Sequence, residues 1–487
     1  MSESLRPQFG LLRFGCALVL AGATWLVNGV QAQAQEAQMT AGVSVDGKTP
    51  IDVANLIANP RLANQLRSLV IPIAQVGKAD GQQQLSNFDL FNVFRIAELT
   101  LPATDAKDTV ERRRQKIKSA EILRIAGNAS IPQDLHDRAN QLMIANLVPL
   151  IGNAQYSMDA RYNAMLLLGM LDKVEPDSAA GRAAVPLDAA EPILLQAAKT
   201  ATLPEILRIG ALIGLARHCD LQLAGANRPA IAAEALALLS AKTPPDGYSA
   251  NGFHWARKQA IAMVIGLAKT GNETSQPPFV QALQGIMADE SQPLFLRRDA
   301  ALAFGYIDPA SIAAGSVKAD DICKAMANLT LAVTKAGTPR FDPTAPVDLS
   351  KPEDVFQTPN EDNKVRFAEG VAYYLNCIAT GLGGRSTNRG LIKGINAADP
   401  AFARVNTLLN THVNPLATAL SKPNPDSNRL ISDLEGKRGP LEEWMRQNQL
   451  VAGPAAGANA APVGNGAPVG NGAPVGAGGA LGAPRAP

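Results

Sequence analysis

One short phrase recurs through the middle of this chain and limits what it can fold into. An arginine is followed three residues later by an alanine, and then by apolar residues at helical spacing. Residues spaced by three and four fall on one face of a helix, so each copy predicts an amphipathic helix. The arginines are Arg161, Arg208, Arg257 and Arg297, and the alanines are Ala164, Ala211, Ala260 and Ala300.

Each copy is preceded by another helix-like segment, and proline and polar residues separate the two. The repeating unit is therefore expected to be two antiparallel helices. One such hairpin cannot bury its apolar face alone, and stacking on the next unit buries it. The chain is 46% hydrophobic but only 5% aromatic, which favours close helix–helix packing over a sheet core. We expect an all-α fold.

The arginine phrase and its unit of roughly 40–47 residues resemble the HEAT-like family of helical repeats. The resemblance covers about residues 131–310 and continues more weakly to about Lys422. It implies a right-handed α-solenoid of stacked antiparallel hairpins. We expect the repeated arginines to hydrogen-bond neighbouring loops.

One feature departs from the family pattern. HEAT-like repeats usually carry an acidic residue six positions before the arginine, where it forms part of a polar ladder between units. Here those positions hold Gln155, Thr202, Asn251 and Ser291. Any ladder is therefore expected to be uncharged on that side or rebuilt from other residues.

The first 34 residues predict a signal peptide. They contain a positively charged start, an apolar run over residues 14–30, and small residues at positions 32 and 34. An uncleaved membrane anchor is the alternative, since the run is nearly long enough to span a bilayer. After cleavage no transmembrane span is expected. The mature chain is expected to be exported, to the periplasm or to the cell surface and extracellular space.

The other boundaries follow from composition. Residues 35–60 are expected to be a flexible segment, 61–130 a helical N-terminal cap region and 131–449 the HEAT-like repeat domain, interrupted by a proline-rich loop at 336–363. Residues 450–487 are almost wholly Gly, Ala, Pro, Val and Asn, and contain APVGNG, APVGNG and APVGAG in succession. This composition predicts a disordered tail.

The sequence offers little chemistry. It has no CxxC, HExxH or HxH pair, so we expect no metal and no cofactor. His218, Cys219 and Asp220 form its one local cluster of ligand-type residues, for which a role at a helix end is the better interpretation. Whether Cys323 and Cys377 form a disulfide is left open. A GxSxG elbow is absent too, and no catalytic residues are expected.

A glycine-rich stretch, TGLGGRSTNRGLIKG, is the most interesting polar segment. Backbone N–H groups together with Arg385, Arg389 and Lys393 could contact an anion or a partner. The stretch matches neither the P-loop nor the dinucleotide-binding pattern. A loop with solvated charges is the alternative.

Charge and resemblance together suggest a function class. The chain has 45 basic and 43 acidic residues, a balance that creates no field to attract nucleic acid, so no nucleic-acid partner is expected. The resemblance implies a non-enzymatic scaffold that binds an unidentified protein partner along an extended face. A HEAT-like lyase-type enzyme and a cell-envelope polymer-binding module are the alternatives.

Overall fold

The chain is almost entirely helical wherever the computed structural model describes it. The described residues are 53–76, 81–102, 108–117, 132–177, 179–221, 225–271, 273–313, 317–336, 364–384, 389–420 and 427–450. In these ranges the strands are β1 (Asp172–Val174) and β2 (Val185–Pro186), which form one small antiparallel hairpin. The expected all-α class is confirmed for this part of the chain.

Several sequence predictions fall on residues outside the described ranges. They are the signal peptide, most of the flexible N-terminal segment, nearly all of the proline-rich loop, Arg385, and the tail from Val451 onward. No helix within the described ranges is long and apolar enough to cross a membrane.

Four pairs of helices occupy the region of the recurring phrase, and in each pair the two helices pack against each other. The pairs are α7 (Gln133–Gly152) with α8 (Met158–Gly169), α9 (Glu191–Lys199) with α10 (Glu205–Asp220), α11 (Arg228–Ser240) with α12 (Ala250–Thr270), and α13 (Pro277–Ala288) with α14 (Leu294–Ala303). The 3₁₀ turns η3 (Asp188–Ala190) and η4 (Gly225–Asn227) precede α9 and α11.

Further helices lie at both ends of this region. Before it come α3 (Val53–Ala58), α4 (Pro60–Val76), α5 (Gln82–Ala97), the 3₁₀ turn η1 (Glu98–Thr100) and α6 (Val110–Lys116). After it come α15 (Pro309–Ala313), α16 (Ala319–Ala336), α17 (Lys364–Gly383), η7 (Leu391–Gly394), α18 (Pro400–Thr407), the π-helical η8 (Leu408–Val413), α19 (Asn414–Leu420) and α20 (Ser427–Gln447). Helices α16 and α17 make a fifth contacting pair.

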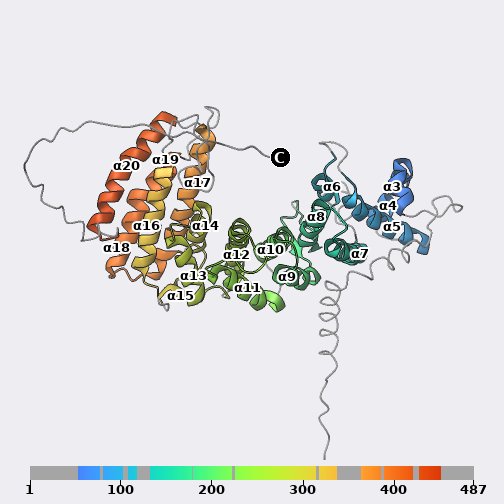
Figure 1. Ribbon diagram of the computed structural model, residues 1–487, viewed down its shortest axis with the longest axis horizontal. Helices are drawn as coiled ribbons and strands as arrows, with labels where there is room; N and C mark the ends of the chain where they lie inside the picture. Colours follow the sequence, from blue (N-terminus) through green and yellow to red (C-terminus); the bar gives the residue numbers. More distant parts are fainter. Residues whose placement is uncertain are drawn as a thin grey trace, which may run out of the picture.

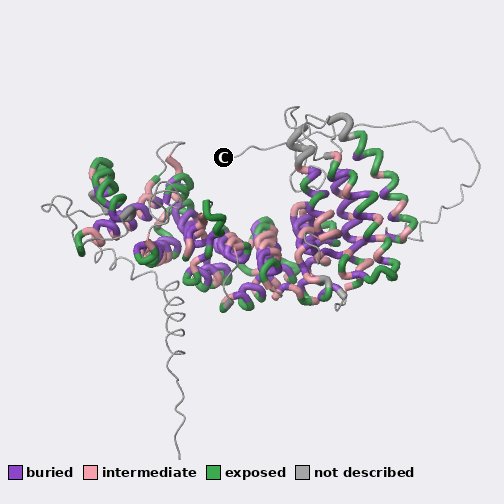
Figure 2. The backbone as a smooth tube through the Cα atoms, turned by 180° about the vertical axis from the view of Figure 1, so that it is seen from behind, coloured by how far each residue is buried: buried purple, intermediate pink, exposed green. Residues whose placement is uncertain are grey.

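We call α8, α10, α12, α14 and α17 the second helices, and their partners the first helices. Each second helix packs against the next one in chain order. The helices follow an arc, with α8, α10, α12 and α14 along its inner side and α7, α9, α11 and α13 along its outer side (Figure 1). Buried residues extend along the whole arc instead of collecting in one central core (Figure 2).

At the end of each hairpin where the two helices are connected, the recurring arginine of the second helix donates a hydrogen bond to the end of the first helix. Arg297 Nε donates to Met287 O at 2.9 Å, and Arg161 Nε donates to Ile151 O at 2.9 Å. Arg208 Nε donates to Ala198 O at 3.2 Å, and Arg257 reaches the equivalent Leu239 O through Nη2 at 2.9 Å. Each acceptor is the second-to-last residue of the first helix. The arginine therefore satisfies a carbonyl that the helix end leaves without an internal partner, where positive charge is also favoured.

These contacts differ in part from the sequence prediction. The shared acceptor is the end of a helix, although two of the arginines also reach a loop of the following unit. Arg208 Nη1 donates to Asp246 O at 2.8 Å, and Arg257 Nη1 donates to Gln292 Oε1 at 2.9 Å. All four arginines are buried, and burial lowers the pKa of Arg161, Arg257 and Arg297.

Polar contacts also join the two helices at the open ends of three hairpins. His136, near the start of α7, lies 3.5 Å from Glu175, which follows β1 in the segment after α8. His218, near the end of α10, lies 3.7 Å from Glu191 at the start of α9. Arg228, the first residue of α11, donates to Leu267 O near the end of α12 at 3.0 Å. In these three hairpins the start of the first helix thus meets the end of the second helix, or the segment just after it, so the two helices run antiparallel.

Candidate binding surface

The side of the second helices that does not pack on the first helices is unusually apolar. On α10, Ile206, Ile209 and Ile213 recur at a spacing of three and four, and each is at least partly exposed. Intervals of three, four or seven residues add Met158, Tyr162 and Leu166 on α8 with Met170 just after it, Trp255, Ala262 and Ile265 on α12, Phe295 and Leu302 on α14 with Tyr306 three residues after its end, and Tyr373 on α17. We call these residues, with the three isoleucines, the apolar face.

Within the apolar face, a ring of α12 stacks on a ring of α14. The ring centroids of Trp255 and Phe295 lie 5.7 Å apart with an interplanar angle of 28°. Lys258 Nζ lies 4.7 Å from the Trp255 ring and 5.9 Å from the Phe295 ring. An ammonium group over an aromatic face is held by the ring quadrupole, so this cation is already engaged within the surface.

A buried cation joins α14 to α17. Arg298 Cζ lies 4.8 Å from the Tyr373 ring and 4.4 Å from the Tyr374 ring. Its Nε donates to Asp299 Oδ1 at 2.8 Å. Burial raises the pKa of the Asp299 carboxyl, against the opposing effect of Arg298. Burial also raises the pKa of Tyr374 to about 12, which keeps this tyrosine neutral at physiological pH.

The face continues toward the N-terminal side. A Cβ atom at Gly210 of α10 would lie 3.1 Å from the Tyr162 ring, so the tyrosine of α8 covers this glycine. Lys269 Nζ, at the end of α12, lies 5.6 Å from the ring of Tyr306. Contacts made by residues of the apolar face therefore link α8 to α10, α12 to α14 and α14 to α17, and α10 packs directly against α12.

Solvent exposure distinguishes this surface from the outer side of the arc. Trp255 and Tyr373 are 48% and 52% exposed. The fully exposed side chains of the first helices are mostly short or polar, as with Gln133, Asp137 and Gln141 of α7. Contiguous exposed apolar surface is uncommon on soluble proteins and marks interaction sites. The apolar face is thus the strongest candidate for a binding surface.

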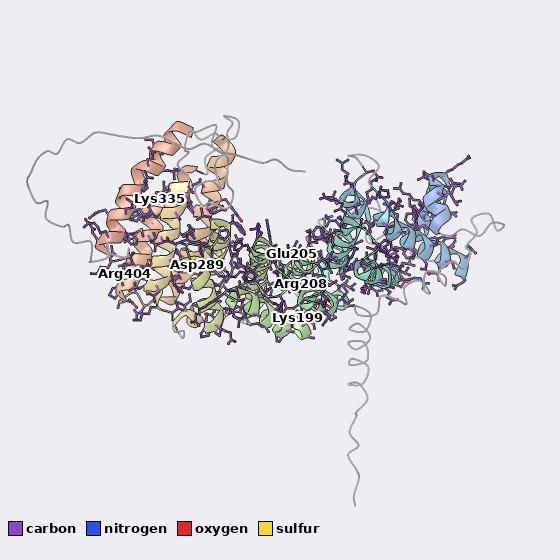
Figure 3. The ribbon with its side chains drawn as sticks, viewed as in Figure 1. Lys199, Glu205, Arg208, Asp289, Lys335 and Arg404 are labelled. Carbon is purple, nitrogen blue, oxygen red and sulfur yellow. The ribbon has the colours of Figure 1, made fainter. Side chains whose placement is uncertain are left out.

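A polar ladder lies beside the face, where the second helices begin. Glu205 of α10 accepts hydrogen bonds from Ser249 N at 2.7 Å and Ser249 Oγ at 3.0 Å, just before α12. Arg208 Cζ lies 3.8 Å from the Tyr248 ring. Figure 3 shows Glu205 and Arg208 near the start of α10, close to Lys199 at the end of α9. Units are therefore linked here by residues other than the four expected ladder positions.

Charged pairs link the opposite ends of the second helices. Arg217 of α10 donates to both carboxylate oxygens of Asp172, just after α8, at 2.8 and 2.9 Å. Lys269 of α12 pairs with Asp220, the last residue of α10. The structure thus contains a charged ladder, built from other residues.

The predicted anion-contacting residues are not brought together as one cluster in the described part of the chain. Arg389 Nη1 donates to the carbonyl oxygens of Ala268 and Tyr306, which joins the ends of α12 and α14. Lys393 is exposed on η7. Arg385 lies outside the described ranges.

The three residues of the sequence cluster have separate partners. His218 faces Glu191, Asp220 pairs with Lys269, and burial raises the pKa of the Cys219 thiol to about 12. No group of three or more His, Cys, Asp or Glu side chains placed to hold a metal occurs in the described ranges. Cys323 and Cys377, left open as a disulfide, are both buried free thiols.

The apolar face is not among the features predicted from the sequence. A signal was present in the segment EILRIGALIGLAR, where Ile206, Ile209 and Ile213 lie between buried positions. Apolar residues therefore surround this helix instead of forming one stripe, a pattern that indicates apolar contacts on more than one side.

Comparison with known proteins finds no match for this chain among protein-family models or curated protein sequences. The interpretation of the apolar face therefore depends on its own geometry.

Proposed function

We propose that this chain is an exported scaffold without catalytic activity of its own, a right-handed HEAT-like α-solenoid that binds an extended polypeptide along its apolar face. The observation that carries the proposal is the presence of exposed or partly exposed apolar residues on five second helices that pack against one another in chain order. A partner laid across them would meet a new apolar anchor at each helix, at the interaxial separation of about 8–10 Å typical of packed helices.

The chemistry of the face suits a polypeptide partner. Trp and Tyr are enriched among the residues that dominate binding energy at protein interfaces, and Trp255 and Tyr373 are its most exposed rings. Covering one such ring removes a large apolar area from water, at about 25 cal/mol per Å². The predicted signal peptide at residues 1–34 supports export of this scaffold.

Photo-crosslinking tests the proposal. A benzophenone amino acid replaces Trp255 in the full chain expressed in its native cells. Val185 of β2, which is 39% exposed and lies outside the apolar face, serves as the matched control position. We expect one defined protein to crosslink from position 255 and not from position 185. Equal labelling from both positions, or no product from position 255, would contradict the proposal.

A polymer partner is the second candidate, because exposed rings such as Trp255 and Tyr373 also stack on sugars. Cosedimentation of the purified mature chain with protein-free cell-wall polymer separates the two. Binding that is lost in Trp255→Ser would favour the polymer, whereas a chain that stays in the supernatant would favour the polypeptide.

A further inference from the structure

The apolar face lies within reach of a segment of this same chain. Leu450, the last described residue, is 4% exposed and follows directly on α20. Helix α20 packs against α17, which carries Tyr373 at one end of the apolar face. The chain then continues from residue 451 to 487 with three consecutive six-residue repeats, each containing one Pro-Val pair.

From this arrangement we infer that the tail is an occupant of the apolar face. Its Pro-Val pairs dock in an extended conformation on alternate second helices. The inference rests on the proposed function, since it assigns a particular polypeptide to the same face. The pairs are Pro462-Val463, Pro468-Val469 and Pro474-Val475.

Composition matches the surface. Proline-containing extended segments dock on grooves lined with aromatic rings, because their conformation is largely preset and costs little entropy to order. The tail has Arg485 as its only charged residue. The cations on the face already have partners, since Lys258 lies over Trp255 and Arg298 pairs with Asp299. An uncharged ligand leaves these contacts intact.

The periods of the two repeats also match. In an extended polyproline-type conformation the chain advances about 3.1 Å per residue, so six residues cover about 19 Å. Two helix separations of about 8–10 Å come to about 16–20 Å. The face carries exposed or half-exposed aromatic rings on α17, α14, α12 and α8, with Phe295 on α14. Steps over alternate helices from α17 meet three of these rings: Tyr373, Trp255 and Tyr162. Three Pro-Val pairs thus meet three aromatic positions.

Chain direction fixes the order. The tail starts after α20, a helix that packs against α17, and the segment before the first repeat can extend for about 35 Å at this rise per residue. The first Pro-Val pair therefore lies on α17, the second on α12 and the third on α8. The tether holds the repeats at an effective concentration on the order of millimolar, so weak individual contacts suffice to keep the tail in place.

Site-specific crosslinking in the full chain tests this order. A benzophenone amino acid is placed at Val463, Val469 or Val475 in turn, and the crosslinked peptides are mapped by mass spectrometry. We expect products with α17 from position 463, with α12 from position 469 and with α8 from position 475. Mixing isotopically light and heavy chains shows whether each product forms within one chain, as the inference requires.

A variant on the face sharpens the result. Trp255→Ser changes an exposed side chain and leaves the buried core intact. We expect it to reduce the product from position 469 by about tenfold, the equivalent of about 1.4 kcal/mol, while the product from position 463 remains. Products scattered over the first helices, products between chains, or an unchanged yield in Trp255→Ser would overturn the inference.

The two proposals fail in different ways. A tail that misses the face, in a protein whose position 255 still captures a defined partner, overturns this inference and leaves the proposed function standing. If the tail misses the face and position 255 also captures nothing, both proposals fall.

Discussion

Gly169 at the end of α8 lies against Gly214 in α10 so closely that a Cβ atom on Gly169 would come within 2.5 Å of the Gly214 Cα. The contact is between two backbones, and a larger residue could be accommodated only by moving one helix. Similar approaches occur where Gly266 of α12 meets Cys219 of α10 and where Gly381 of α17 meets Ala301 of α14. Glycines thus set the spacing of α8 with α10, of α10 with α12 and of α14 with α17, and with it most of the dimensions of the apolar face.

Replacing Gly169 by alanine should destabilise the protein. The added methyl group has no space, and overpacking of this kind costs about 1–3 kcal/mol. Urea denaturation of the variant measures the cost.

The control for this variant is Gly285→Ala in α13, where a Cβ would meet nothing within 4 Å. There alanine should stabilise by about 0.5–1 kcal/mol through helix propensity alone. Equal effects at both glycines would show that α8 and α10 can separate without loss.

The sequence predicted the arrangement of local elements better than the surface. Regular spacing of Arg161, Arg208, Arg257 and Arg297 indicated the helix pairs, because each hairpin needs the same packing and the same closing contact. The residue pairs that join the two helices at the open ends of the hairpins could not be predicted. His136–Glu175 and Glu191–His218 join residues distant in sequence, and nothing in their local pattern marks them.

The apolar face was missed for a different physical reason. Periodicity identifies the face of a helix that packs inward, and an additional apolar side is easily read as part of the same core. Trp255 stacks on Phe295 from the next unit, a contact that depends on how adjacent helices align. The position of an exposed ring therefore follows only from the packing of the second helices.

Removing one of the repeated arginines should lower the free energy of unfolding by more than the loss of an exposed polar contact does. In Arg297→Met the side-chain volume is roughly kept, but Met287 O loses its buried donor, at a cost of about 1–3 kcal/mol. Arg446→Met, in which an exposed arginine loses its pair with Glu443, should leave stability nearly unchanged. Comparable costs for the two variants in chemical denaturation would show that Arg297 contributes no more than a surface charge.

The ion pair at the open end of the α11–α12 hairpin should make stability depend on acidity. Arg228 Nε and Nη2 donate to the Glu273 carboxylate at 2.7 and 2.9 Å, and these bonds lower its pKa from 4.5. Because the pKa is lower in the folded protein, the contribution is fully present above about pH 4.5 and is lost as the pH falls through the folded value.

Glu273→Gln isolates that contribution. The substitution should cost about 1 kcal/mol or less at pH 7, since the pair is partly exposed. At pH 3 the variant and the parent protein should approach each other in stability. Thermal denaturation at the two pH values measures the difference, and a gap that stays constant would mean that the carboxylate charge of Glu273 does not contribute.

The three thiols of the described chain should be inert in the native protein. Cys219, Cys323 and Cys377 are buried and free, and burial raises their thiol pKa values to about 12, 12 and 11. The thiolate is the reactive form, so a disulfide-exchange reagent at pH 8 should label none of them until the protein unfolds. In guanidinium without reductant, three thiols per mature chain should then react with the reagent. Reaction of only one thiol per chain would mean that the other two form a disulfide. Cys323 and Cys377, on the neighbouring helices α16 and α17, would then be the first pair to test.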